Sequence, residues 1–321
     1  MLFFDRTAQA AQRRAEQERD LLQRRLDALA DQTRLDVSRR GLFVVGHARS
    51  GTTVLQNALN DSPDVYLCGE AHFHSASGAA GFPRRYNAQH RSWKNQETKG
   101  TYCPILSDGE ETWWETLRRL ADVYRYVGDK IVVNTGEMAM TSDDFIDFYS
   151  RNFYASQYIF TFREPAAVLR STQQLWSYVG APIPEPLLIL NRFITVIQIY
   201  IRMVRTFPHV SCVFHDDVSP NTFDIIGGLL DIDLSNSYGY YDQGKVVSRS
   251  EAIVGEISSE HVDEVIELYD IFRNEASKGF RLLQLGQNDN SLDNKYFTPM
   301  GRLAQRVDAT IAKFENIVRQ S

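Results

Sequence analysis

A short segment from Gly41 to Thr53, GLFVVGHARSGTT, constrains the fold more than any other part of the chain. Its first half holds four consecutive apolar residues, the pattern of a strand that is buried on both faces of a sheet. Gly46 ends this run, a polar turn follows, and residues 52–59 have the pattern of a helix start. Such a unit brings backbone N–H groups and the positive end of a helix dipole to one point. The segment therefore predicts an anion-binding loop at the carboxyl end of a strand.

This loop differs from the Walker A loop of nucleotidases at one chemically important position. The pattern G-x-x-x-x-G-T-T has Thr52 where the signature G-x-x-x-x-G-K-[ST] has the lysine that reaches the β- and γ-phosphates. The cation of the loop is instead Arg49. This arrangement suits a phosphate-like group and argues against Mg-dependent hydrolysis of a nucleoside triphosphate. A P-loop kinase, which also needs a magnesium-binding Asp after a strand, is kept as an alternative.

Length and composition set the fold class. A chain of 321 residues can bury a large core, and 43% hydrophobic with 24% charged residues is ordinary for a globular protein. Short apolar segments alternate with helical patterns, which predicts an α/β fold in which helices flank a parallel sheet. The net charge of −6 argues against a nucleic-acid or anionic-membrane binder. An anionic cofactor then has to be held by a local cluster of cations.

Cysteine usage and hydropathy indicate the compartment. Cys68, Cys103 and Cys212 lie far apart without C-x-x-C spacing, so neither a zinc site nor a disulfide framework is expected. The apolar stretch at the start of the chain is too short for a signal peptide, and no 18-residue apolar run predicts a membrane span. The sequence therefore favours a cytoplasmic protein with reduced thiols.

The first part of the chain predicts a helix. Residues 5–36 contain no Gly or Pro and are rich in Ala, Gln, Arg, Glu and Leu. Three leucines form an apolar stripe that is too short for a coiled coil, so the helix is expected to pack along the rest of the chain. A homodimer through this helix is the alternative. The predicted division is an N-terminal helix over residues 1–40 and an α/β domain over 41–321, which ends in a helical region.

A second strand-to-helix junction has a comparable pattern. Residues 158–162 predict a buried strand, and Arg163 and Glu164 follow it at once. Pro165 then opens a helix, where a proline fits the first turn. Ser171 stands eight residues after Arg163.

The two junctions together resemble the phosphate sites of sulfotransferases, which use 3′-phosphoadenosine 5′-phosphosulfate (PAPS). R-S-G-T-T after a strand resembles their 5′-phosphosulfate loop, and Arg163 with Pro165 and Ser171 resembles their R-[DN]-P-x-x-x-x-x-S motif for the 3′-phosphate. Both motifs occur in the family's order, each at the expected junction. The resemblance covers about residues 41–250, is closest to tyrosylprotein and bacterial-type sulfotransferases, and implies a P-loop-like sheet.

The resemblance also implies how PAPS, and its product PAP (3′,5′-ADP), would be held. Backbone N–H groups and hydroxyls of residues 50–53 would bind the phosphosulfate, while Arg49 places positive charge at the bridging oxygen. Arg163 and Ser171 would bind the 3′-phosphate. A late segment resembles the K-V-x-R-S segment of tyrosylprotein sulfotransferases and is one residue longer. No metal is expected. The full set of cofactor residues is Arg49, Ser50, Gly51, Thr52, Thr53, Arg163, Ser171, Lys245, Arg249 and Ser250.

The catalytic residues follow from the same resemblance. Glu70, in C-G-E after a predicted second strand, resembles the Glu that takes the acceptor proton in tyrosylprotein and some bacterial sulfotransferases. His72 is the alternative base, because cytosolic small-molecule enzymes of the family use a His further along. Lys130 stands where the family often has a Lys that stabilises the transferring sulfuryl group. The family's Lys is normally followed by Thr-Pro or Asp-Pro, whereas Ile-Val follows here. A solvated strand-edge lysine is the alternative.

The resulting hypothesis is an enzyme that moves a sulfuryl group from PAPS to a hydroxyl of a carbohydrate, a phenol or another alcohol by in-line displacement. Residues 75–109 show no periodicity and carry scattered aromatic and basic side chains, so they are predicted to form a loop that faces the acceptor. A catalytically inactive protein that binds PAP or another nucleotide is the second alternative, beside the kinase.

Overall fold

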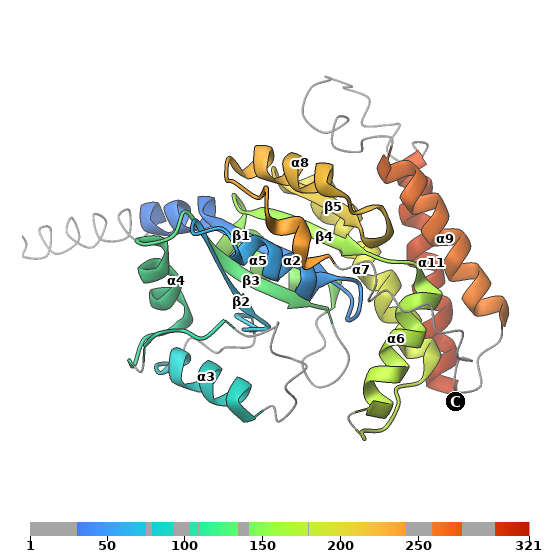
Figure 1. Cartoon of the computed structure of the whole chain (residues 1–321). Coiled ribbons are helices and arrows are strands. Elements are labelled where there is room, and N and C mark those ends of the chain that lie inside the picture. The colour runs from blue at the N-terminus through green and yellow to red at the C-terminus, as the bar shows by residue number, and fades with distance from the viewer. Residues whose placement is uncertain are drawn as a thin grey trace, which may run out of the picture.

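The computed structural model describes residues 31–74, 79–92, 103–107, 109–133, 141–178, 180–241, 259–277 and 299–320 (Figure 1). Five parallel strands form one sheet in the order β2-β3-β1-β4-β5. Helices cover both of its faces, so the predicted α/β fold is confirmed. The strands are β1 (Gly41–Gly46), β2 (Val65–Gly69), β3 (Tyr126–Val132), β4 (Gln157–Phe162) and β5 (Val210–Phe214).

Helices follow the strands along the chain and divide between the two faces. They are α2 (Thr52–Asn60), α3 (Phe82–Ser92), α4 (Trp113–Ala121), α5 (Ser142–Phe153), α6 (Pro165–Tyr178), α7 (Pro186–Thr206), α8 (Pro220–Leu230), α9 (Ser259–Ser277) and α11 (Pro299–Gln320), with the short 3-10 helices η2 (His215–Asp217) and η3 (Ser237–Tyr240). Helices α2 and α8 share a core with one face of the sheet, and the remaining α-helices pack on the other. Helices α9 and α11 lie side by side at one end of the molecule (Figure 1), as the predicted helical C-terminal region requires.

The central strand β1 explains why the apolar run predicted this fold. All six of its residues are buried, because β1 pairs with β3 on one side and β4 on the other and is covered on both faces. Leu42 and Val44 enter the core beneath α2, whereas Phe43 and Val45 enter the opposite core. The pairing of β1 with β4 runs to Gly46 opposite Thr161.

The strand order places a ligand-binding edge between β1 and β4. From β1 the chain crosses to β2 on one side of the sheet, and from β4 it crosses to β5 on the other side. Neighbouring strands whose connections leave in opposite directions form the switch point at which open α/β sheets bind ligands, outside the carboxyl ends of the strands. Both sequence motifs follow these two strands.

Helix α7 has the length and composition of a membrane-crossing helix, with a mean hydropathy of 1.6 over its most apolar window, but 61% of that window is buried inside the protein. Its apolar residues pack in the core against the neighbouring helices α5, α6, α9 and α11. The composition of α7 therefore has a packing explanation.

The prediction of an aperiodic loop over residues 75–109 is wrong where α3 forms. Phe82 and Tyr86, four residues apart, are buried and stack on each other with ring centroids 5.9 Å apart. The Tyr86 hydroxyl accepts a hydrogen bond from the N–H of Gly69 at 2.8 Å, which docks α3 against the end of β2. Residues 31–39 are helical. The earlier part of the helix predicted over 1–40 lies outside the described residues, and its role in a dimer stays a prediction.

Candidate active site

The loop between β1 and α2 folds back over the end of its own strand. A Cβ on Gly46 would lie 2.6 Å from the Ser50 and Thr161 hydroxyl oxygens, so only glycine allows this close return. The Ser50 hydroxyl donates to the carbonyl of His47 at 2.7 Å and lies 2.9 Å from Thr161 Oγ1. With 1% of Ser50 exposed, its side chain fixes the loop to β4. The N–H of Ser50 also donates to the His47 carbonyl, at 3.2 Å, so both donors of this residue are bonded within the loop.

Helix α2 begins without a side-chain cap. Its N-cap residue Gly51 has a φ of 98° and has no side chain that could accept a hydrogen bond from the first turn. The first bond of the helix runs from the N–H of Leu55 to the carbonyl of Gly51. The N–H groups of Thr52, Thr53 and Val54 therefore have no partner within the helix, and they point to the same spot as the positive end of its dipole. This end of α2 has the chemistry of an anion site.

Arg49 joins the two motifs. Its backbone has a φ of 68°, in the left-handed region that residues with a Cβ rarely adopt. Its Nε donates to the Ser171 hydroxyl at 3.0 Å, and Arg163 Nη1 lies 3.5 Å from the Arg49 carbonyl oxygen. The sequence assigned Arg49 to one end of the cofactor and Arg163 and Ser171 to the other. The structure brings all three together across the β1–β4 edge.

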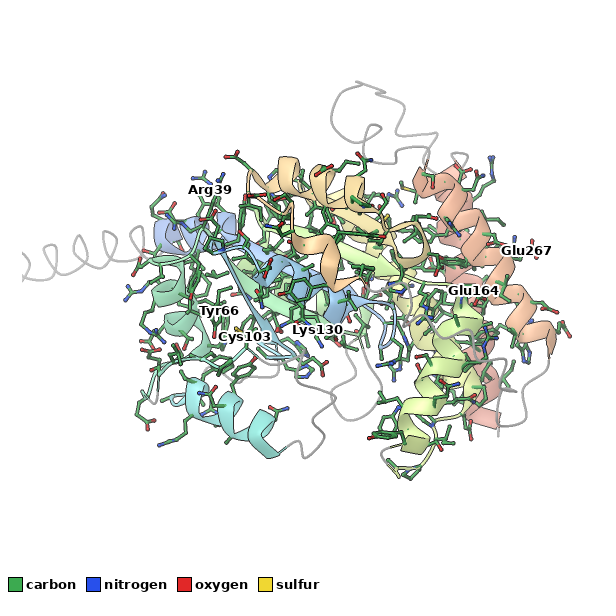
Figure 2. All side chains as sticks on the ribbon, viewed as in Figure 1. Arg39, Tyr66, Cys103, Lys130, Glu164 and Glu267 are labelled. Carbon is green, nitrogen blue, oxygen red and sulfur yellow. The ribbon has the colours of Figure 1, made fainter. Side chains whose placement is uncertain are left out.

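The start of α6 is closed by a side chain. The Glu164 carboxylate accepts from the N–H groups of Ala166 at 2.8 Å and Ala167 at 2.6 Å, and Pro165 has no N–H to satisfy. Glu164 lies where β4 passes into α6 (Figure 2). In the family motif an Asp or Asn stands at this position, and here a Glu caps the helix.

Two buried nitrogens have no hydrogen-bond partner in the described structure: Arg163 Nε beside the start of α6, and His215 Nδ1 beside the start of α2. His215 follows β5, and a Cβ on Gly51 would lie 2.7 Å from its Nδ1, so the imidazole covers the start of α2. Burial, and then the charge of Arg163, lower the pKa of His215. His215 was not among the site residues predicted from the sequence, although its place directly after the mostly apolar segment 210–214 was a usable signal.

Glu70 and Lys130 form a buried ion pair at the end of β2. Lys130 Nζ lies 2.5 Å from Glu70 Oε1, with 1% of the Lys130 side chain and 19% of the Glu70 side chain exposed. Lys130 lies in the interior of the molecule (Figure 2), so the alternative of a solvated strand-edge lysine is wrong. Its Nζ also lies 3.4 Å from Thr53 Oγ1 at the start of α2. The ammonium group therefore lies between the Glu70 carboxylate and the start of α2.

Two histidines follow Glu70, and burial lowers the pKa of both. For His72 burial is the largest cause; Lys130 adds to it and Glu70 opposes it. The pKa of His74 falls to about 4 through burial and the nearby His72. The two rings lie 5.8 Å apart between centroids. Both imidazoles are therefore neutral near pH 7, and His72 is a weaker proton acceptor than an unperturbed histidine.

Asp129 is a second residue that the sequence analysis missed. Only 1% of it is exposed, and its two carboxylate oxygens lie 3.1 and 3.0 Å from the N–H nitrogen of Ala71. Burial raises the pKa of Asp129 to about 8, opposed by hydrogen bonds from the backbone of Ala71 and His72 and by the charge of Lys130. Two adjacent charged residues inside a buried strand are unusual, and that pattern was the available signal.

His47, the first residue after Gly46, is buried in a neutral form. One of its ring nitrogens, Nδ1, lies 2.7 Å from the carbonyl oxygen of Ala48, and the other has no partner in the described structure. Burial is the main cause that lowers its pKa to about 4, and the charge of Arg192 lowers it further. The predicted cofactor residues Lys245, Arg249 and Ser250 lie outside the described residues.

Comparison with known proteins gives three results. A family model described as "Sulfotransferase family" matches residues 41–191. No curated protein sequence matches at a significant level. Among solved structures, the sulfotransferase STF9 from Mycobacterium avium is similar with a TM-score of 0.42 and 12% identity, over 72% of this chain and 76% of that one. A sulfotransferase from Alicyclobacillus acidocaldarius has a TM-score of 0.40 and 14% identity, over 75% and 94%. Mouse sulfotransferase SULT7A1, complexed with PAP, has a TM-score of 0.37 and 12% identity, over 83% and 88%.

Proposed function

We propose that this chain moves a sulfuryl group from PAPS to a hydroxyl group of an acceptor, and the match of a sulfotransferase family model to residues 41–191 supports this proposal. The observation that carries the proposal is the contact of Lys130 with both Glu70 and Thr53. The buried ammonium group thus has a carboxylate on one side, which can accept a proton. On its other side is the uncapped start of α2, which can hold an anion.

The residues at the β1–β4 edge fit the anionic groups of PAPS. The first turn of α2 offers N–H groups without a cap, as an oxyanion needs. Arg163 has a buried Nε without a partner among the described residues, and a guanidinium group suits a phosphate. We assign the 5′-phosphosulfate to residues 51–53 and the 3′-phosphate to Arg163 and Ser171. Arg49, which bonds to Ser171, supplies positive charge between the two groups.

In the proposed reaction the acceptor oxygen bonds to the sulfur of PAPS while the bond from sulfur to the bridging oxygen breaks, so that PAP leaves. Glu70 takes the proton of the acceptor hydroxyl. The contact with the Lys130 ammonium favours the charged carboxylate, which is the form that accepts a proton. Lys130 also faces Thr53, so its charge stabilises negative charge that develops on the transferring group beside the loop. The direct contact of Glu70 with Lys130, whose Nζ also lies beside Thr53, supports Glu70 over His72 as the base.

Two other functions remain as alternatives to this proposal. A P-loop kinase would have a lysine at the position of Thr52. The uncharged threonine of this chain cannot neutralise a γ-phosphate. A protein that binds PAP without catalysis would need the anion sites but not the Glu70–Lys130 pair. Burying an ion pair costs free energy unless its geometry is excellent, and the placement of this pair against the loop supports an enzyme.

The variant Glu70→Gln tests the enzyme hypothesis. Glutamine keeps the size and polarity of the side chain but cannot take a proton, so turnover is expected to fall about 10²–10⁴-fold. Radiolabelled PAPS with a panel of carbohydrate, phenol and alcohol acceptors measures this loss and identifies the acceptor class. PAP affinity, measured by calorimetry, is expected to change little.

His72→Ala is the matched control and is expected to have the milder effect on turnover. Full turnover in Glu70→Gln together with its loss in His72→Ala would identify His72 as the base. If PAP binds tightly and no acceptor in the panel is sulfated by the unaltered protein, the binding protein without catalysis becomes the better description.

A further inference from the structure

We propose that Asp129 is a positioning residue, which holds the turn after β2 so that Glu70 faces Lys130. The inference rests on the proposed function, since it concerns the base of that same reaction. It adds a residue that touches neither the acceptor nor the cofactor in the proposed arrangement and acts through the backbone of residues 70–72.

Asp129 and Lys130 hold this turn from the two faces of the sheet. They are consecutive residues of β3, so their side chains point to opposite faces. Lys130 reaches Thr53 on the face that α2 covers. Asp129 lies on the other face, which its strand neighbours Val127 and Ile131 share with a separate core.

At the end of β2 the backbone N–H groups change their acceptor from a carbonyl of β3 to the side chain of Asp129. The N–H of Glu70 still donates to the Lys130 carbonyl at 3.0 Å, which continues the β2–β3 ladder by one residue. The next N–H, of Ala71, donates instead to the Asp129 carboxylate, at 3.0 and 3.1 Å from its two oxygens. The backbone N–H of His72 also hydrogen-bonds to Asp129. The chain therefore leaves the sheet around this one carboxylate.

The turn needs such support because its backbone is strained. Glu70 has a φ of 56° and His72 a φ of 50°, both in the left-handed region that residues with a Cβ rarely adopt. Residues keep such conformations only where their surroundings hold them. The left-handed φ at Glu70 and the bonds of the following N–H groups to Asp129 together set the direction of the Glu70 side chain toward Lys130 Nζ.

The burial of Asp129 points the same way. Its strand neighbours on that face, Val127 and Ile131, are apolar, and a carboxyl group buried among them costs free energy unless it is hydrogen-bonded. The hydrogen bonds that it accepts come from the backbone of the residues directly after Glu70. The position of a carboxylate in this strand is therefore explained by the turn that it holds.

Crystal structures of the protein without ligand test the proposal for Asp129→Ala and Asp129→Asn. In Asp129→Ala we expect β2 and β3 to keep their pairing, while residues 70 and 72 leave the left-handed region and Glu70 separates from Lys130. Asn keeps the size of the side chain but accepts through only one atom, so we expect a partial shift if Asp129→Ala does not fold. An unchanged Glu70–Lys130 contact in either variant overturns the proposal. This readout needs neither PAPS nor an acceptor, so it stands apart from the proposed function.

A double-mutant cycle on turnover gives the second readout, with any acceptor that the unaltered protein sulfates. We expect Asp129→Asn to lower kcat about 10- to 100-fold, as a misplaced catalytic group does, without weakening PAP. Added to Glu70→Gln, the same change is expected to lower kcat by no more than about twofold further, because it acts through Glu70. Effects that multiply would show that Asp129 acts independently of Glu70 and would overturn the proposal.

Discussion

The junctions β1–α2 and β4–α6 follow neighbouring strands and end at the same edge of the sheet, but they satisfy the start of their helices in opposite ways. Helix α2 has glycine at its N-cap and no side-chain cap, which leaves its first N–H groups to a ligand. Helix α6 has its first N–H groups bound by Glu164. The first-turn N–H groups are therefore open at the junction after β1 and already bound at the junction after β4.

This difference implies a division of roles between backbone and side chain. An anion at α2 can be held by the main chain, which no substitution removes directly. At α6 the carboxylate of Glu164 already occupies the N–H groups, so an anion beside it has to be held by a side chain, and Arg163 is adjacent. Variants at the two junctions are therefore expected to separate loop geometry, ligand binding and helix stability.

The largest effect on stability is expected from Gly46→Ala. The added Cβ would lie 2.6 Å from two hydroxyl oxygens and 2.8 Å from Thr52 Cγ2, so the loop has to move away from β4. We expect the free energy of unfolding to fall by about 3 kcal/mol, as in an overpacked core, and PAP binding to weaken with it. Urea denaturation measures the change.

Gly228→Ala in α8 is the control for Gly46→Ala. No atom of the described residues lies within 4 Å of the position that its Cβ would take, so the variant is expected to be neutral or to be more stable by about 0.5–1 kcal/mol. Equal stability of the two variants would mean that the loop does not need glycine at residue 46, and that the open helix start is not maintained by this close return.

Arg163→Ala tests whether the anion beside α6 is held by a side chain. Losing a hydrogen bond to a charged group is expected to weaken PAP binding by about 1.5–3 kcal/mol. The unaltered protein is expected to bind PAP far better than 5′-AMP or ATP in calorimetry without Mg, because the proposed site at Arg163 recognises the 3′-phosphate. Equal affinity for PAP and AMP would remove this assignment.

His47→Gln tests how the stability of the β1–α2 junction depends on pH. The pKa of His47 is lowered to about 4, so between pH 6.5 and 4 the unfolded chain binds a proton that the folded protein does not. Stability contributed by this group is therefore lost as the pH falls through that range, by about 2 kcal/mol between pH 6.5 and 5 at 1.36 kcal/mol per pKa unit.

The unfolding free energies of the unaltered protein and His47→Gln are to be compared at pH 7.5 and pH 5. Asp129, with its raised pKa, changes stability in the opposite sense with pH, but it is present in both proteins and cancels in the difference. A difference that does not change between the two pH values would show that His47 is not held neutral by burial.

The smallest effect is expected from Glu164→Ala, the neighbour of Arg163→Ala. It removes the cap of α6 and is expected to lower the free energy of unfolding by about 1 kcal/mol, the usual value for a lost N-cap. It is not expected to weaken PAP binding, since it removes a negative charge beside Arg163. A larger loss of PAP affinity in Glu164→Ala than in Arg163→Ala would contradict the assignment of Arg163 as the anion-binding residue and of Glu164 as the cap of α6.

The sequence predicted both junctions because each depends on residues that are close together in the chain. An apolar run, a glycine or proline and a helix start can be recognised without the strand order. The contact of Glu70 with Lys130 could not be recognised in this way, because it joins residues 60 positions apart and requires β2 to lie beside β3. The solvated alternative for Lys130 failed for the same reason.

Helix α3 and the role of Asp129 could not be predicted either, because each depends on residues that only the folded chain brings close. Helix α3 has only a short apolar pattern, Phe82 and Tyr86, in a polar stretch, and tertiary contacts with β2 and Phe73 decide that it forms. The sequence does not explain an Asp in a buried strand, because its partner, the N–H of Ala71, lies in the turn after β2.

The pairing of β1 with β4, with Gly46 opposite Thr161, has a consequence for the fidelity of folding. Side chains alternate between the faces of a strand, so a shift of β4 by one residue would turn each of its side chains to the other face. The Ser50–Thr161 contact would be lost, and Arg163 would leave the carbonyl of Arg49. A chain that is compact and helical but misaligned by one residue would lack the contacts that join the two junctions. The alignment of two adjacent strands is thus the element of folding on which the proposed recognition of PAPS depends.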